Sequence, residues 1–307
     1  MEFELIKNGV AAQINNFNIK DISVDKGIEI KNCLLENVVV VLKNQDVAPA
    51  YFTNFVDNIG PIANHDQFIY DPITGERKYS LGGKNDKLID PLSWPDPYTY
   101  PVQRVTGKKV KGEISGIFGT GILDWHANLN GLTRADGVAL QGIKDVEGTS
   151  TSFLNTAKVY EEMPEELIER CNNVYCEYEY SPDTWAAGLP EKQKAVMMKN
   201  QSHYKMWLIQ ENILGKKGIY FYTNNRCNII TEDKKLYQDL YDFVFQEKYI
   251  YSHTYEVGDI VLSDQLLSLH KRDQNDPGIL SKRTLHRITF RLSNTGNPTW
   301  IERKNSI

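Results

Sequence analysis

Hydrophobic positions in the first sixty residues change between helical and strand periodicity. Apolar residues recur at helical spacing over residues 24–36, which predicts an amphipathic helix. The β-branched run at residues 38–42 follows at once and predicts a buried strand. Helical spacing returns over residues 48–59, and Gly60-Pro61 ends it. The chain therefore opens as helix–strand–helix, and residues 1–24, with their Asn and Gly turns, are expected to form short edge strands.

From residue 119 onward, short apolar segments alternate with turns, and only a few helical patterns interrupt them. Many short strands with helices near the front favour a fold that is mainly β with covering helices, a jelly-roll barrel or double-stranded β-helix. The predicted strands cover residues 138–143, 174–180, 219–222, 260–262 and 284–292, and the predicted helices cover residues 157–160, 164–172 and 234–246.

Composition and charge remove several classes of protein. The chain has 307 residues, of which 41% are hydrophobic and 24% charged, and its net charge is −5. This mild acidity argues against nucleic acid as the main partner. No apolar run approaches the roughly 18 residues that a membrane helix needs. The N-terminus, MEFELIKNGV, lacks the basic flank and apolar core of a signal peptide. We therefore expect a cytoplasmic protein without a membrane partner; the sequence is compatible with a homo-oligomer.

The four cysteines suggest packing rather than chemistry. Cys171 and Cys176 have the outermost spacing of zinc ligands, but no second Cys/His pair follows to complete a site. Four cysteines are too few for a disulfide scaffold in a chain of this length. We interpret them as buried or idle thiols.

Candidate chemistry gathers around two histidines. The sequence has none of the HExxH, GxSxG, Walker or GxGxxG patterns. In His126-Ala127-Asn128, the first and third side chains would share one face of a strand and could address one metal ion. His270 is the candidate third ligand. The other histidines, at positions 65, 203, 253 and 286, are interpreted as surface or packed residues.

Two arginines near the C-terminal end suggest an anion. Arg283 and Arg287 are four residues apart, so they would share one face of the predicted apolar strand. Two guanidinium groups on such a face are costly unless they meet anions.

Taken in order, these residues resemble the taurine dioxygenase (TauD/TfdA) family of iron(II)- and 2-oxoglutarate-dependent oxygenases. The resemblance includes the helix ending at Gly60-Pro61, the segment Gly148-Thr149-Ser150-Thr151 and the distal His270 with its arginine pair. It implies that His126 and His270 bind iron, with Fe(II), 2-oxoglutarate and O2 as cofactor and cosubstrates.

The resemblance also assigns the residues that bind the cosubstrate. Thr151 matches a threonine that contacts 2-oxoglutarate near the metal. Arg283 and Arg287 match the arginines that hold its carboxylates, with Arg283 on the distal one. A planar guanidinium fork suits a carboxylate better than a point charge does.

One residue departs from the family pattern. The facial triad of this family is two histidines and a carboxylate, but position 128 is Asn. Three explanations stay open. Asn128 is a weak ligand of the metal ion, or it lies behind the ligands and leaves a coordination position open for water or an anion, or the protein has lost catalytic turnover. Asp124, two residues before His126, is a further candidate ligand.

We expect a dioxygenase that oxidises a small organic substrate, most simply by hydroxylation, and releases succinate and CO2. The alternative is a catalytically impaired or non-catalytic 2-oxoglutarate-binding protein of the same fold. Because the site residues span positions 126 to 287, residues 1–307 are expected to form one domain. Loop insertions at about residues 62–118 and 180–215 would form its lid.

Overall fold

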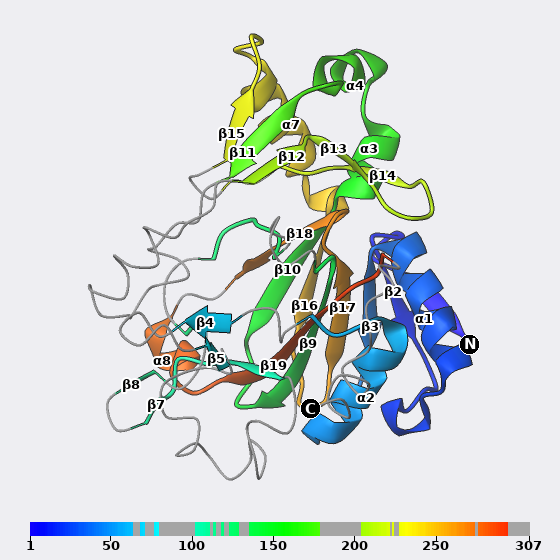
Figure 1. The fold of residues 1–307 in the computed structure, drawn as a ribbon, viewed down its shortest axis with the longest axis vertical. Helices are drawn as coiled ribbons and strands as arrows, with labels where there is room; N and C mark the ends of the chain where they lie inside the picture. The colour runs from blue at the N-terminus through cyan, green and yellow to red at the C-terminus, as the bar shows by residue number, and fades with distance from the viewer. Residues whose placement is uncertain are drawn as a thin grey trace.

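Two β-sheets that face each other form the centre of the protein (Figure 1). The computed structural model describes residues 1–63, 68–70, 77–79, 102–110, 113–114, 118–119, 123–128, 135–178, 204–221, 223, 227–273 and 276–293. The larger sheet has the strand order β1 (Phe3–Ile6), β2 (Ala11–Ile14), β3 (Val39–Leu42), β17 (Ile260–Asp264), β9 (Gly137–Lys144), β19 (Thr284–Phe290) and β6 (Gln103–Val105). The smaller sheet has the order β16 (Ile250–Thr254), β10 (Ser150–Asn155) and β18 (Ser268–Arg272).

Two helices near the N-terminus cover the outer face of the larger sheet. They are α1 (Val24–Asn37) and α2 (Pro49–Ile59), which lie side by side next to β2 and β3 (Figure 1). Helix α1 begins at Ser23, whose hydroxyl accepts a hydrogen bond from the backbone of Lys26, and α2 ends at Gly60. Their buried faces pack on alternate residues of the strands, such as Ile288 and Phe290 of β19. This burial removes the apolar stripe of each helix from water.

The inward faces of the two sheets share a second apolar cluster. It joins residues of the larger sheet, such as Leu140 and Leu285, to Phe153 of the smaller one. Because side chains alternate along a strand, Leu285 and Arg287 point inward while Ile288 points toward the helices. The interior of the jelly roll is therefore lined mainly by apolar side chains, and Arg287 of β19 projects into it.

A further layer lies beside the two sheets, at the top of Figure 1. It consists of the sheet β12 (Tyr204–Trp207), β11 (Tyr175–Tyr178) and β15 (Cys227–Ile230), the pair β13 (Ile209–Glu211) and β14 (Lys217–Ile219), and the helices α3 (Thr156–Glu162), α4 (Glu165–Cys171) and α7 (Leu236–Val244). The remaining elements are the single turns η1 (Ile19–Asp21) and η4 (Glu247–Tyr249), the pairs β4 (Phe68–Tyr70) with β5 (Arg77–Tyr79) and β7 (Lys109–Val110) with β8 (Glu113–Ile114), and α8 (Pro277–Leu280).

The architecture agrees with the predicted mainly β jelly roll, and the predicted helices are confirmed to within a few residues. Several strands were not predicted, among them all three strands of the smaller sheet β16-β10-β18. The predicted strand at 219–222 is wrong in its bounds, because β14 ends at Ile219. Much of the two expected insertions, 62–118 and 180–215, lies outside the described residues, so the single-domain organisation stays a prediction.

All four cysteines are free thiols, and burial raises the pKa values of Cys33 and Cys171 to about 11. Among the described helices, none is both long and apolar enough to cross a membrane.

Candidate active site

The segment 123–128 lies along the outer edge of β18 and places the first histidine opposite the second. The backbone N–H of His126 donates to the carbonyl of His270 at 3.0 Å, and that of His270 donates back to His126 at 2.8 Å. A third bond joins Arg272 N–H to the carbonyl of Leu123 at 3.0 Å. Residues directly opposite each other in an antiparallel pair project their side chains to the same face. His126 forms an isolated bridge to His270, and this pairing sets the direction of its side chain.

The two imidazole rings lie close together and are both neutral near pH 7. Their centroids are 4.3 Å apart. Burial lowers the pKa of His126 to about 4, and burial lowers that of His270 well below its usual range. The Nδ1 atom of His126 lies 2.6 Å from the carbonyl oxygen of Asp124, which favours the tautomer that donates from Nδ1 and keeps the lone pair on Nε2. Neutral imidazoles with such oriented lone pairs are suited to bind a metal ion.

Asn128 is the third polar side chain at this position. Its Nδ2 lies 2.9 Å from Nε2 of His270, and its backbone N–H donates to Oε1 of Gln265 at 2.7 Å. Among the described residues, no group of three His, Cys, Asp or Glu side chains is arranged to hold a metal ion. Asp124 therefore does not complete a triad with the histidines; its carboxylate accepts from the N–H of Trp125 at 2.8 Å.

Three arginines, on β18, on β19 and just before β19, are buried. Arg283 and Arg287 are 3% and 4% exposed. Arg287 lies on β19 and Arg283 directly precedes it, so their spacing of four residues predicted that they share one face of the strand. The third, Arg272, is 5% exposed; it was not singled out in the sequence, although it follows His270 by two residues on β18 and must share its face. In the strand register it lies directly opposite Thr151.

Electrostatic effects show how these cations are distributed. Arg287 contributes to the low pKa values of both His126 and His270, so it lies toward the histidines. Burial lowers the pKa of Arg272 to about 9, with a contribution from Arg283, and burial lowers that of Arg283 to about 10. The guanidinium groups of Arg272 and Arg283 are therefore charged at neutral pH.

Some of these cations have polar partners in the protein. Arg272 donates from Nη1 to the carbonyl of Phe118 at 2.6 Å, and Arg287 donates from Nη1 to the side chain of Gln103. In contrast, Nη1 of Arg283 is buried and has no hydrogen-bond partner among the described residues.

The residues fit the groups that the sequence implies. Two neutral imidazoles and an amide oxygen are chemically suited to a divalent transition metal such as iron(II). Nη1 of Arg283 is buried without a partner in the described part of the chain, which is costly unless a ligand accepts from it. A buried positive cluster beside the histidines suits a dianion such as 2-oxoglutarate.

The other candidate residues lie apart from this site. His253 is buried in a network with Tyr251 and Asp259, and His286 is buried on the outer face of β19. His65 and His203 lie outside the described residues. Cys171 and Cys176 are packed in the apolar cluster of the upper layer.

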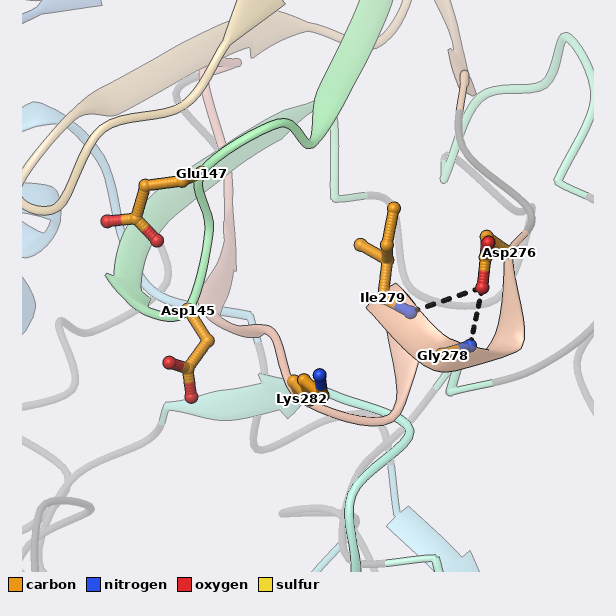
Figure 2. A pocket seen from close by; sticks show the side chains of 6 residues that line it. All are labelled: Asp145, Glu147, Asp276, Gly278, Ile279 and Lys282. Carbon is orange, nitrogen blue, oxygen red and sulfur yellow. Dashed lines mark hydrogen bonds between the residues drawn. The ribbon is translucent and has the colours of Figure 1, made fainter.

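An open surface pocket of about 340 Å³ lies elsewhere, between the β9–β10 turn and α8 (Figure 2). Asp145 and Glu147 of the turn line one side of it, and Asp276, Gly278 and Ile279 line the other (Figure 2). None of the candidate ligands lines this pocket.

A jelly roll that joins two histidines beside buried arginines is the arrangement expected of a 2-oxoglutarate-dependent dioxygenase. The model of the taurine catabolism dioxygenase TauD, TfdA family matches residues 2–289, and the chain belongs to this family.

Individual relatives are distant. The alpha-ketoglutarate-dependent 2,4-dichlorophenoxyacetate dioxygenase of Burkholderia sp. (strain RASC) is 24% identical over 165 residues, which are 50% of this chain and 54% of that protein. Pentalenolactone F synthase of Streptomyces avermitilis is 20% identical over 206 residues, 61% of this chain and 67% of that one. The first match thus spans about half the length of the relative.

Solved structures share the fold over nearly the whole chain. AAD-2 in complex with Mn(II) and N-oxalylglycine aligns with a TM-score of 0.66 and 13% identity, covering 94% of this chain and 96% of that one. A taurine dioxygenase from Burkholderia xenovorans aligns with a TM-score of 0.63 and 15% identity, covering 94% and 88%. The jelly-roll fold predicted from the sequence is confirmed.

Proposed function

We propose that the chain is an iron(II)- and 2-oxoglutarate-dependent dioxygenase that hydroxylates a small organic substrate. The observation that carries the proposal is the pairing of His126 with His270, with Asn128 against one ring and the charge of the buried Arg287 acting on both rings. Family membership supports the same reaction class. The overall change consumes 2-oxoglutarate, O2 and a substrate C–H group, and yields succinate, CO2 and the hydroxylated product.

His126, His270 and Asn128 would hold the metal ion. The carbonyl of Asp124 holds one imidazole by its Nδ1, and Gln265 holds the backbone of Asn128, so these donors are oriented before the metal binds. When bound, iron(II) would supply the activation of O2 that couples decarboxylation of the 2-oxo acid to C–H oxidation. The amide of Asn128 carries no charge, so we expect the metal to be held less tightly than by a carboxylate.

Thr151, Arg283 and Arg287 would bind the cosubstrate. Arg283 is the residue for the distal carboxylate, because its buried Nη1 has no partner among the described residues. Arg287 lies closer to the histidines and would neutralise charge on the metal side. The apolar side chains between the sheets keep water away and thereby strengthen these charge-assisted hydrogen bonds.

The substrate would approach from the side of the segments at 62–118 and 180–215, within a single domain. Specificity in this proposal resides in those segments. The neutral Asn128 also supports a second candidate function, a 2-oxoglutarate-binding protein of the same fold with little or no turnover.

Anaerobic titration with iron(II) and 2-oxoglutarate tests the proposal. Formation of the complex should give a weak visible charge-transfer band, and Arg283→Gln should weaken the binding that produces it. Failure to bind 2-oxoglutarate would contradict the proposed function. Succinate formation in the presence of O2 and a mixture of metabolites separates the enzyme from the non-catalytic alternative.

A further inference from the structure

The hydroxyl of Tyr255 and Nη1 of Arg283 are among the buried polar atoms that have no hydrogen-bond partner of ordinary geometry in the described part of the chain. The two residues are only 1% and 3% exposed. A buried donor without a partner costs about 1–3 kcal/mol, so native proteins keep few of them unless a ligand satisfies them.

The two atoms belong to the same part of the barrel interior. The charge of Arg283 acts on the Tyr255 hydroxyl, and that of Tyr255 acts on Arg283. The side chain of Thr151 acts on the phenol oxygen as a hydrogen-bond donor and lowers the pKa of Tyr255, although the contact lies outside ordinary hydrogen-bond geometry. The proton of the Tyr255 hydroxyl has no acceptor among the described residues. Arg283 and Thr151 are the residues already proposed for the distal carboxylate, so Tyr255 faces the same position.

The ring of Tyr255 is held in place. Its backbone N–H donates to the carbonyl of Thr149 at 3.0 Å. Its ring packs edge-to-face on His253, with centroids 4.8 Å apart. His253 is itself fixed by hydrogen bonds to Tyr251 at 2.9 Å and to the buried Asp259 at 3.1 Å. The hydroxyl therefore stays directed at one position in the interior.

The chemistry of the three groups selects an anion. Burial raises the pKa of Tyr255 above its usual range, so its hydroxyl is a proton donor at neutral pH. Arg283 can only donate, and the hydroxyl of Thr151 can also donate. Donors gathered in one buried part of the interior match the lone pairs of a carboxylate.

We propose that Tyr255 is a cosubstrate-binding residue whose hydroxyl donates a hydrogen bond to the distal carboxylate of 2-oxoglutarate, beside Arg283 and Thr151. This inference rests on the proposed function. It explains why the proton of a buried phenol hydroxyl has no acceptor among the described residues, because the carboxylate of the cosubstrate would accept it. It also makes Tyr255 a residue that selects 2-oxo acids with a second carboxylate.

Binding of 2-oxoglutarate to the Mn(II)-loaded protein, measured by calorimetry, tests the proposal with Tyr255→Phe. A hydrogen bond to a charged group contributes about 1.5–3 kcal/mol, so the variant should bind 2-oxoglutarate at least about tenfold more weakly. Its affinity for 2-oxopentanoate, which has the same chain length but no distal carboxylate, should not change. Equal weakening for both acids, or no weakening for 2-oxoglutarate, would overturn the inference.

Thermal unfolding supplies a readout that a merely structural tyrosine would not give. Without ligand, Tyr255→Phe removes an unsatisfied donor, so the variant should be at least as stable as the unmodified protein. The matched control is Tyr249→Phe, since Tyr249 is fully buried but donates its hydroxyl to Glu162 at 3.1 Å. The control should lose stability and keep its affinity for 2-oxoglutarate. A clear loss of ligand-free stability in Tyr255→Phe would also overturn the inference.

The two proposals fail in different ways. If the unmodified protein does not bind 2-oxoglutarate, the proposed function fails and this inference fails with it. If the unmodified protein binds and Tyr255→Phe binds equally well, only the role of Tyr255 is wrong.

Discussion

Gln265 accepts a hydrogen bond from the backbone N–H of Asn128 at 2.7 Å, across 137 positions of sequence. Its side-chain amide is fixed at both ends, because Nε2 donates to the hydroxyl of Ser263 at 2.7 Å. Gln265 is completely buried. It therefore fixes the segment that presents Asn128 to His270, and it is a positioning residue of the candidate metal site.

Replacing this glutamine should loosen the metal site. Gln265→Leu leaves the N–H of Asn128 without its partner, and loss of an outer-shell contact typically lowers metal affinity about 10–100-fold. Calorimetry or electron paramagnetic resonance with Mn(II) measures this affinity. The matched control is Gln141→Leu, which removes a buried hydrogen bond to the carbonyl of Asp46 elsewhere in the fold. The control should lose stability and keep its metal affinity; equal affinities in the two variants would contradict the role of Gln265.

Asn128→Asp should raise the affinity for iron(II). A carboxylate adds a full negative charge where the amide offers only a neutral oxygen, and about 1.4 kcal/mol suffices for a tenfold change. Asn128→Ala should lower the affinity, because it removes the oxygen. Anaerobic equilibrium titration of both variants measures the effect. Unchanged affinity in both would mean that Asn128 does not contact the metal.

Arg272 should contribute to binding of the dianionic cosubstrate through its charge. Arg272→Gln is expected to weaken binding of N-oxalylglycine to the Mn(II)-loaded protein by about tenfold, the change that about 1.4 kcal/mol gives. The neighbouring Lys271 is a suitable control, because it lies on the other face of β18, with its ammonium 4.9 Å from the centroid of the Trp125 ring. Lys271→Gln removes the same charge and should leave the affinity unchanged. Equal losses in the two variants would indicate only a general field effect.

The buried carboxyl of Asp264 should make stability depend on pH. Burial raises its pKa to about 7, so the folded protein keeps a proton that the unfolded chain, with an ordinary pKa near 4, has released. The stability that this proton supplies is complete below about pH 4 and is lost as pH rises to about 7. The loss amounts to about 4 kcal/mol at about 1.4 kcal/mol per pKa unit.

Asp264→Asn removes this titration. As the pH rises from 4 to 8, the free energy of unfolding of the variant should therefore increase relative to that of the unmodified protein. Urea unfolding at the two pH values measures the change. Gln141→Leu replaces a buried polar group that does not titrate, and its effect should be the same at both pH values. A constant difference between Asp264→Asn and the unmodified protein would show that Asp264 is charged when folded.

The elements with a clear hydrophobic period were predictable from the sequence. Helix α1 and strand β3 follow directly from their apolar spacing. The strands of the smaller sheet carry polar residues on their inward faces, as in the sequences STSFLN, IYSHT and SLHKR. Those polar residues interrupt the apolar alternation that marks a strand. On β18 they include the candidate ligand His270, and on β16 they include His253, which is buried in a hydrogen-bond network of its own.

The candidate site was predictable in part. The sequence pattern indicated three residues whose side chains the fold brings together, namely His126, Asn128 and His270. It also indicated the two arginines on and before β19, which are buried. Arg272 had a usable signal, since its position two residues after His270 predicts a shared face. Tyr255 and Gln265 had none, because their roles depend on neighbours that only the folded chain brings together.

The bridge between His126 and His270 has a consequence for synthesis of the protein. Asn128 and His270, the partners of the 2.9 Å contact, are separated by 142 positions. A chain made from its N-terminus exposes the first imidazole long before the second has been translated. The segment 123–128 can pair with β18 only after residue 270 has left the ribosome. Under the proposed function, a metal ion could be bound by both histidines only in the nearly finished polypeptide, and truncated products that end before β18 would lack the second imidazole.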